Sequence, residues 1–256
     1  MSRSVGQVNG SDASGRIFIL SDDNMADVRR PRRTRADLRQ QLLESALVEF
    51  GAKGYDGAST RSIAKRVDAQ QPQINYHFAS KEALWEASVD HLFGLLAEAL
   101  GELRPLDSDD PVVLGHALAE MLRRFVRFAA AHPELNQIMV HEGTEDSDRS
   151  RWMVDRYARP WYDVTATLWG RLRAAGITAP IQPSRVYWVI VGAASIPFVN
   201  ASEVRTLTGD EPTAPAWVES HADDLIATLL PGLDEPARNA RDAGRASSVG
   251  SGSSSQ

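Results

Sequence analysis

Four side-chain amides lie within one short segment in the first third of the chain: Gln70, Gln71, Gln73 and Asn75. An amide can donate and accept hydrogen bonds at once, which suits the edge that adenine presents in the major groove of DNA. Tyr76, His77 and Lys81 come just after them and offer a hydroxyl, an imidazole and an ammonium group for phosphates. We therefore expect a surface that reads DNA bases with neutral amides. The alternative is that the amides form an ordinary solvated helix face.

The residues around these amides predict three short helices. The first has an apolar face at Leu38, Leu42, Leu43, Ala46, Leu47 and Phe50. Gly51 and Gly54 should end it, Ser59 or Thr60 can cap the second helix, and Pro72 suits the first turn of a third that runs through Phe78. Two short helices joined by a tight turn cannot bury their apolar faces alone. We expect the first helix to complete their core and the third to protrude, at a width that a major groove admits.

The start of the predicted second helix adds polar groups to this surface. Thr60 and Arg61 stand in its first turn, where backbone N–H groups have no partner inside the helix. Such groups favour an anion, so a phosphate contact is expected here as well.

The whole segment resembles the DNA-binding signature of the TetR family over about residues 36–84. The resemblance rests on Thr60-Arg-Ser-Ile-Ala-Lys-Arg-Val67, Gln71-Pro-Gln-Ile-Asn-Tyr-His-Phe78 and Ser80-Lys-Glu-Ala-Leu84. It implies base contacts from the helix that holds Gln71, Pro72 and Gln73. It also implies phosphate contacts from Thr60, Tyr76, His77 and Lys81.

Two positions depart from the family pattern. Asp68 stands where the family often has glycine in the turn between the helices, so Asp68 is predicted to adopt an unusual backbone angle that aspartate tolerates. Asn75 stands where the family often has tyrosine, with Tyr76 directly after it. Either of these two residues could provide the phosphate contact.

Composition divides the chain into four parts. Residues 1–33 and 234–256 are rich in small and polar residues and are predicted to be a disordered arm and a disordered tail. Residues 34–80 should form the helix-turn-helix domain, and residues 81–233 a helical ligand-binding and dimerisation domain. The basic run Arg29–Arg35 could enter the minor groove beside the recognition helix, or attract DNA without specificity.

Charge and composition exclude several classes of protein. The net charge is −6, with the acidic residues concentrated after residue 90, which argues against a protein that coats nucleic acid indiscriminately. There is no cysteine, so disulfide frameworks and thiolate sites are absent. No apolar run reaches the ~20 residues of a membrane helix. We expect a cytoplasmic protein without a membrane partner.

The remainder of the chain also has helical spacing. Helices are predicted from Lys81 to about Leu100, from Asp109 or Asp110 to about His132, from Glu134 to His141, from Asp148 to Ala175, from Pro183 to Asn200 and from Trp217 to Leu230. Pro160 should kink the longest of them, because it removes a backbone donor. The predicted fold is all-α, with about nine helices in total.

The C-terminal helices carry enough large side chains to enclose a cavity for a small molecule. Aromatic and polar residues are mixed on two of them, at Met139, His141, Glu142, Trp152, Tyr157, Trp161 and Tyr162. This mixture suits a ligand with an apolar body and a few hydrogen-bonding groups. The alternative is that the aromatic residues are plain core.

Neither a metal, a cofactor nor an enzyme activity is expected. His116, His132, His141 and His221 lie on different predicted helices without the short spacing of a metal site. His141 and Glu142 are an adjacent acid–base pair, but neighbours on a helix point about 100° apart. A helical enzyme built on this pair is the competing hypothesis.

The last two predicted helices are candidates for a dimer interface, at Trp188, Gly192, Ser195, Trp217, Leu225 and Leu229. Small residues allow close approach and the large apolar ones supply contact area, although the same residues could be core within one chain. The family resemblance implies a homodimer, whose two-fold symmetry requires a palindromic operator in double-stranded DNA.

Together these features predict a regulator of transcription that responds to a small molecule. The favoured form is a repressor released from its operator by an unidentified effector, with the helix from Lys81 to Leu100 as the lever. An activator, or a DNA-binding protein without a small-molecule effector, remains the alternative.

Overall fold

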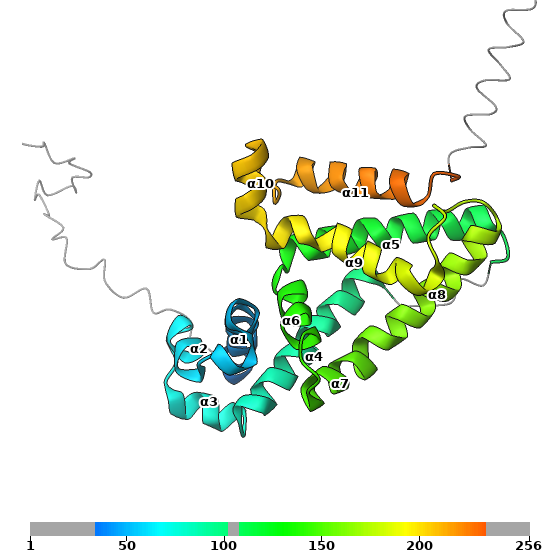
Figure 1. The fold of residues 1–256 in the computed structure, drawn as a ribbon. Coiled ribbons are helices and arrows are strands. Elements are labelled where there is room, and N and C mark those ends of the chain that lie inside the picture. Colours follow the sequence, from blue (N-terminus) through cyan, green and yellow to red (C-terminus); the bar gives the residue numbers. More distant parts are fainter. Residues whose placement is uncertain (1–33, 102–107, 234–256) are drawn as a thin grey trace, which may run out of the picture. The chain divides into compact units, whose positions relative to one another are not determined.

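The computed structural model describes residues 34–101 and 108–233, and every regular element in these residues is helical (Figure 1). The elements are α1 (Arg35–Gly57), α2 (Thr60–Arg66), α3 (Gln71–His77), α4 (Lys81–Leu100), α5 (Pro111–Ala131), α6 (Glu134–Gly143), α7 (Asp148–Met153), the π-helical segment η2 (Val154–Ala158), α8 (Arg159–Ala174), α9 (Pro183–Val199), α10 (Ala201–Thr208) and α11 (Pro215–Leu229). The all-α prediction is confirmed. The predicted arm 1–33, and with it most of the basic run, and the tail 234–256 lie outside the described residues.

The chain divides into two units after Leu38, and residues 34–38 are the described part of the first unit. They start α1 with a reciprocal cap. The Thr34 backbone N–H donates to the Asp37 carboxylate (2.9 Å), and the Asp37 N–H donates to the Thr34 hydroxyl (3.1 Å). The rest of the fold belongs to the second unit.

The first helix runs further than the sequence predicts. Gly51 does not end α1, and the break comes at Gly54, where φ is 66° and ψ is 178°. A glycine ends a helix when its backbone turns to positive φ, and Gly51 keeps helical geometry inside the element. The chain then makes one further turn to Gly57.

The three N-terminal helices share one core. Leu43, Leu47 and Phe50 of α1, Ile63 of α2 and Ile74 of α3 are all buried, and Ser45 of α1 donates to the Ile63 carbonyl. This is the predicted packing, in which α1 covers the apolar sides of two helices that are too short to cover each other.

The predicted cap of the second helix and the predicted turn at Asp68 are confirmed, and Ser80 provides a further cap. Ser59 caps α2, with its hydroxyl accepting from the Ser62 N–H, and Ser80 caps α4, accepting from the Ala83 N–H. Asp68 has φ 53°, the positive angle predicted for the turn before α3. These local features fix how far α3 projects from the core.

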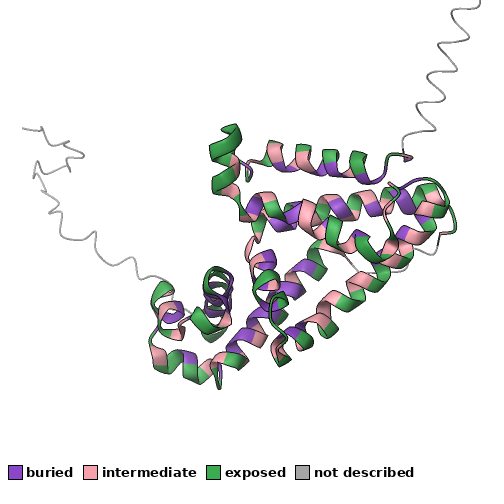
Figure 2. Ribbon diagram, in the orientation of Figure 1, coloured by how far each residue is buried: buried purple, intermediate pink, exposed green. Residues whose placement is uncertain are grey.

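The second core lies among α5, α8, α9 and α11. Buried side chains meet there from all four helices, including Leu118 and Val126 of α5, Trp169 of α8, Ala194 of α9 and Ala222 of α11. The buried residues follow the inner sides of these helices in Figure 2. No described helix combines the length and the apolar composition that crossing a membrane requires.

The structure refines the predicted helix count in two places. The helix predicted from Asp148 to Ala175 is divided into α7, η2 and α8. The Arg159 N–H bonds to the Val154 carbonyl, one residue further back than in an α-helix. This widened turn directly precedes Pro160, whose missing donor was expected to kink the helix. The second difference is α10, which the sequence analysis did not predict.

Candidate nucleic-acid interface and internal pocket

A buried glutamate of α1 fixes the position of α2. The Glu49 carboxylate is 1% exposed and accepts hydrogen bonds from Lys53 Nζ (2.7 Å), Arg66 Nη2 (2.9 Å) and the Ser59 N–H (3.3 Å). Burial raises the pKa of Glu49, but the hydrogen bonds from Lys53 and Arg66 outweigh it and hold the pKa below its ordinary value. The contacts at Ser59 and Arg66 lie at the two ends of α2, so one carboxylate sets the helix against α1.

The amides of α3 lie in a local hydrogen-bond network. Gln71 Nε2 lies 3.2 Å from Thr60 Oγ1 and 3.3 Å from Asn75 Oδ1, so one amide connects α2 to the second turn of α3. The Gln70 backbone N–H donates to Gln73 Oε1 (2.7 Å), which caps the start of α3. Gln73 and Asn75 are exposed and Gln71 is half-buried. The network positions three amides on a helix whose buried side is held by Ile74.

The other predicted contacts surround these amides. Tyr76 is 59% exposed, Pro72 and Arg61 are exposed, and His77 is half-buried. Lys81, at the start of α4, lies 3.3 Å from the Asp56 carbonyl and 4.8 Å from the centre of the Tyr55 ring. The ten predicted DNA contacts therefore lie on α2, α3 and the adjoining turns, with their polar groups on the outside of one small core.

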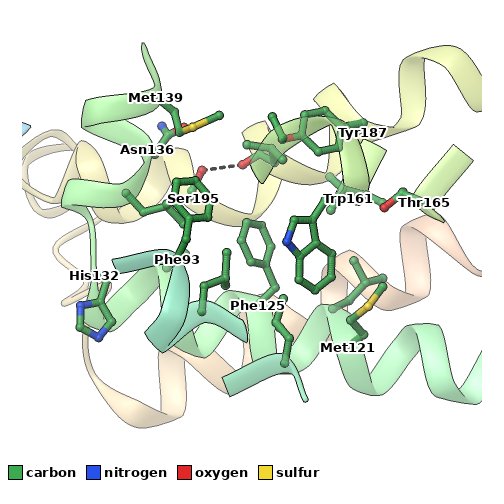
Figure 3. A pocket seen from close by; sticks show the side chains of 18 residues that line it. Phe93, Met121, Phe125, His132, Asn136, Met139, Trp161, Thr165, Tyr187 and Ser195 are labelled. Atoms are coloured by element: carbon green, nitrogen blue, oxygen red, sulfur yellow. Dashed lines mark hydrogen bonds between the residues drawn. The ribbon is translucent and has the colours of Figure 1, made fainter. Parts of the chain in front are cut away.

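The described residues also line a pocket of about 80 Å³. A single water needs about 10–15 Å³ by the same measure, so the pocket has room for a small organic molecule. Its walls come from α4, α5, α6, η2, α8 and α9, and aromatic rings dominate them: Phe93, Phe125, Trp161 and Tyr187 (Figure 3). Of the residues predicted to bind a ligand, Met139 and Trp161 lie on this wall.

Four side chains of the pocket carry nitrogen or oxygen atoms and have no hydrogen-bond partner among the described residues: Asn136, Trp161, Thr165 and Tyr187. Asn136 and Thr165 are each only 7% exposed. By contrast, the Ser195 hydroxyl donates to the Val191 carbonyl of its own helix (2.5 Å), the bond drawn in Figure 3. Burial raises the pKa of Tyr187, so its phenol stays protonated.

The remaining predicted ligand residues lie outside the pocket wall. His141 Nε2 bonds to the Gly51 carbonyl (3.1 Å), and Glu142 is buried beside Arg149, 3.5 Å away. Tyr162 donates to the Ser184 carbonyl (3.4 Å). The adjacent pair His141 and Glu142 is thus committed to separate partners. In the described residues, no three His, Asp or Glu side chains come together in a group that could hold a metal ion.

Trp152 and Tyr157 belong to a cluster of aromatic rings behind the pocket. Trp152 lies 5.6 Å from Trp85, and Tyr157 stacks on Phe93 at 4.1 Å between ring centres. Burial, and the hydrogen bond to Asp90, raise the pKa of Tyr157 to about 12. Because Phe93 also lines the pocket, these rings support its wall without touching the space inside.

Sequence reasoning missed Asn136, Thr165 and Tyr187. A signal for Thr165 was present, since it stands four residues after Trp161 and four before Trp169, on an otherwise apolar helix face. Asn136 similarly lies next to Leu135 and three residues before Met139. An isolated polar residue within an apolar face can therefore indicate a cavity.

The helix α6 contacts both the pocket and α1. Leu135, Asn136 and Met139 line the pocket on one side. On another side, His141 bonds to Gly51, and a Cβ atom at Gly51 would lie 2.8 Å from Gln137 Oε1. Glycine at position 51 thus permits a close approach between α6 and α1.

The predicted dimer residues divide into two groups. Trp188 is 67% exposed and Gly192 is half-buried on α9. Ser195, Leu225 and Leu229 are buried within the chain, and Trp217 stacks on His221 with 5.1 Å between ring centres. Val189 and Ile196 extend the exposed apolar surface of α9.

Comparison with protein families finds two matches. Residues 42–87 match the family described as bacterial regulatory proteins, tetR family, and residues 115–229 match the tetracyclin repressor-like C-terminal domain. The first match covers α2, α3 and the start of α4, and the second covers most of the helices around the pocket.

Individual relatives agree with these matches. The chain is 36% identical to the biofilm operon icaADBC HTH-type negative transcriptional regulator IcaR of Staphylococcus aureus over 59 residues, 23% of this chain and 32% of that protein. It is 28% identical to the HTH-type transcriptional repressor NicS of Pseudomonas putida over 113 residues, 44% of this chain and 51% of that protein. The aligned part of the chain thus spans about a third to a half of the length of these relatives.

Among solved structures, the chain resembles AibR in complex with isovaleryl coenzyme A and operator DNA. The TM-score is 0.58 at 19% identity, and the match covers 77% of this chain and 99% of that chain. At this identity the likeness shows the fold.

Proposed function

We propose, because the chain belongs to the TetR family of bacterial regulatory proteins, that it is a homodimeric transcriptional repressor. A small molecule releases the dimer from operator DNA. The observation that carries the proposal is the exposed row of amides on α3, set on a core that the family match covers. Binding to an operator places its action in the cytoplasm. We infer a regulator that binds its ligand without converting it.

Base readout is assigned to Gln71 and Gln73, with Gln70, Pro72 and Asn75 beside them. Gln71 is held by Thr60 and Asn75 before any DNA arrives, so less side-chain freedom is lost on binding. Gln73 uses its oxygen to cap α3, which leaves its amide N–H groups for a base acceptor.

Phosphate contacts are assigned to the residues around this row: Thr60, Arg61, Tyr76, His77 and Lys81. Phosphate contacts set the position of a protein on DNA, and base contacts set the sequence that it prefers. The few cations in this set fit a protein that binds selected sites rather than DNA in general.

The dimer is assigned to the exposed apolar face of α9. Trp188, Val189 and Ile196 would be covered by a second copy, with Gly192 allowing close approach. Two-fold symmetry then places two copies of α3 about 34 Å apart on one face of the duplex, and the operator is palindromic. Leu225 and Leu229 would support this face from within the chain, because they are already buried.

Release is proposed to pass through α6 and α4, since both line the pocket and both reach the DNA-binding helices. The contact of His141 with Gly51 joins α6 to α1, and Lys81, at the start of α4, contacts the Asp56 carbonyl near the end of α1. The ligand must bind the DNA-incompetent geometry more tightly, because equal affinity for both states shifts nothing.

The test is selection of binding sites from a pool of random double-stranded DNA. The full chain should select palindromes, and the double variant Gln71→Ala, Gln73→Ala should lose specific binding by at least about 30-fold, as expected for two base contacts of about 1–3 kcal/mol each. Gln40→Ala is the matched control, an amide of α1 that bonds to Glu44 and His91. Specific binding by the double variant equal to that of the control would refute the assignment.

A further inference from the structure

The pocket wall carries few charged or titratable side chains. Its lining contains no Lys, Arg, Asp or Glu side chain among the described residues. The titratable groups on the wall are His132, which lies 3.0 Å from Glu134 and stacks on Phe128, and the phenol of Tyr187. A carboxylate or phosphate entering this space would leave water and find no Lys or Arg on the wall. The His132 imidazole is its one possible cationic partner among the lining residues. The cost of burying an unpaired charge is far larger than that of burying a neutral polar group.

Polar groups without partners stand against this apolar background. Buried amides and hydroxyls in folded proteins are almost always hydrogen-bonded, because leaving one unpaired costs about 1–3 kcal/mol. Asn136 and Thr165 are each only 7% exposed and have no partner among the described residues. Their polar atoms are unpaired but not fully buried, so they reach the accessible space of the pocket. Both belong to the pocket wall, whereas Ser195, on the same wall, is satisfied within its own helix. The unpaired groups are therefore available to a ligand.

The arrangement of these groups limits the shape of the ligand. Figure 3 shows Asn136 and Met139 on one side of the space, and Trp161 and Thr165 on the other. The rings of Phe93 and Phe125 lie between them. A molecule that fits has an apolar body against these rings and a polar group at its edge.

We propose that the effector is an uncharged small molecule with an apolar, ring-sized body and a hydroxyl or carbonyl group that hydrogen bonds to the Asn136 amide. Thr165 offers a second polar contact on the opposite wall. This inference rests on the proposed function, since it assigns the chemistry of the effector to that same pocket. It also separates this chain from AibR, whose named ligand, isovaleryl coenzyme A, carries phosphates.

The test compares probes that differ in a single group: toluene, benzyl alcohol and benzoate, together with isovaleryl coenzyme A. Binding to the full chain is measured by calorimetry without DNA. Benzyl alcohol should bind at least about tenfold more tightly than benzoate. Equal or tighter binding of benzoate or of isovaleryl coenzyme A overturns the proposal, as does a lack of saturable binding by both neutral probes.

Two variants separate the pocket amide from its surroundings. Asn136→Leu should weaken binding of benzyl alcohol about tenfold and leave toluene within about twofold. Ser195→Ala is the matched control, because it removes a hydroxyl of the same wall that is already bonded, and it should leave both probes within about twofold. Equal effects of the two variants overturn the role of Asn136.

A measurement without ligand tests the second polar group of the pocket. Thr165→Val removes an unpartnered hydroxyl at almost constant volume, so the melting temperature should stay level or rise. A clear fall would show that Thr165 has a structural partner, which contradicts its role in the pocket. Binding of benzyl alcohol with no selected operator would refute the proposed function alone. Operator binding with no response of the pocket to neutral probes would refute this inference alone.

Discussion

Glu49 and Ser45 of α1 differ in their hydrogen bonding from Asn136 and Thr165 of the pocket wall. Around α2, the buried Glu49 and Ser45 are fully engaged, with Ser45 Oγ donating to the Ile63 carbonyl and Glu49 holding three donors. In the pocket, Asn136 and Thr165 have no partner among the described residues. Glu49 and Ser45 are held by partners within the protein, although Gln41 Oε1 of α1 is buried without a partner among the described residues. The polar atoms of Asn136 and Thr165 are open to a molecule in the pocket. Under the proposed function, side chains that contact DNA need to be held in place by the protein. Side chains that bind a ligand need polar atoms that have no partner within the protein.

The pKa values of two buried glutamates can also be compared. Glu49 belongs to the α1–α3 core, and Glu142 lies at the end of α6, outside the pocket wall and beside Arg149. Their pKa values move in opposite directions from the same ordinary value: that of Glu49 is lowered and that of Glu142 is raised. The surroundings of Glu49 stabilise its ionised carboxylate, whereas the surroundings of Glu142 disfavour its ionised form.

The largest effect is expected for Glu49→Gln. The neutral amide cannot replace a carboxylate that holds Arg66, Lys53 and the start of α2. The free energy of unfolding at pH 7 should fall by about 2–3 kcal/mol, measured with urea and circular dichroism. Glu44→Gln, on the exposed side of the same helix, is the control and should change stability by less than about 0.5 kcal/mol.

The pH dependence of this effect has a definite sign. Because the pKa of Glu49 is lower in the folded state, the ionised form stabilises folding above the ordinary pKa of 4.5. That contribution is lost as the pH falls below 4.5 through the lowered value. The difference in the free energy of unfolding between wild type and Glu49→Gln should therefore shrink on acidification. A difference that grows on acidification would contradict the role of the Glu49 carboxylate in holding α2.

Glu142→Gln should have a smaller effect of the opposite sign. Burial raises the pKa of Glu142, and the charge of Arg149, 3.5 Å away, offsets this only in part. One oxygen of Glu142 and the Nε of Arg149 are buried without hydrogen bonds. Arg149 keeps its contact with the Tyr55 ring, 3.7 Å away, when the carboxylate is removed. The variant should gain up to about 1 kcal/mol at pH 7.

The sign follows from proton binding. The folded protein holds the Glu142 proton more tightly than the unfolded chain, so the ionised group costs stability above its raised folded pKa. This penalty disappears as the pH falls below 4.5, and the gain from Glu142→Gln should disappear with it. Urea unfolding at several pH values measures both variants together. A loss above about 1 kcal/mol at pH 7 would show that Glu142 forms a true ion pair.

The sequence predicted the α1–α3 core better than the pocket because its determinants are local. Ser59, Ser80 and Pro72 act on the helix turn in which they stand, and the row of amides follows from their spacing on α3. The hydrogen bonds by which Glu49 holds α2 were not predicted, because they depend on how α1 and α2 cross. Their trace in the sequence is the pair Ser45 and Glu49, four residues apart beside the apolar face.

The pocket depends on contacts that spacing does not encode. Met139 and Trp161 were placed on its wall, but His141 and Glu142, on the same helix as Met139, turn toward α1 and α7. A rotation of α6 by one residue, about 100°, exchanges these faces. That rotation is set by Gly51, 90 residues away in the sequence, whose lack of a Cβ lets α6 approach. Whether a side chain on a short helix faces a cavity is therefore decided by its neighbours in the fold.

The smallest effect is expected for Asp68→Gly, in the turn before α3. Asp68 is exposed, has φ 53° and makes no side-chain hydrogen bond among the described residues. Glycine adopts this angle without strain but loses more conformational entropy on folding, so the two effects nearly cancel. Stability should change by less than about 1 kcal/mol in either direction, measured by urea unfolding, and binding to selected operators should stay within about threefold.

Asp68→Ala is the matched control, because it removes the same carboxylate and keeps a Cβ atom. It should lose about 1 kcal/mol relative to the glycine variant, since alanine is strained at this angle. Equal stability of the two variants would mean that the carboxylate, not the backbone, matters at this turn. If operator binding falls in both variants while stability holds, the acidic group contributes to the DNA surface itself. The turn would then act in the proposed DNA contact and not only in the structure of the α1–α3 core.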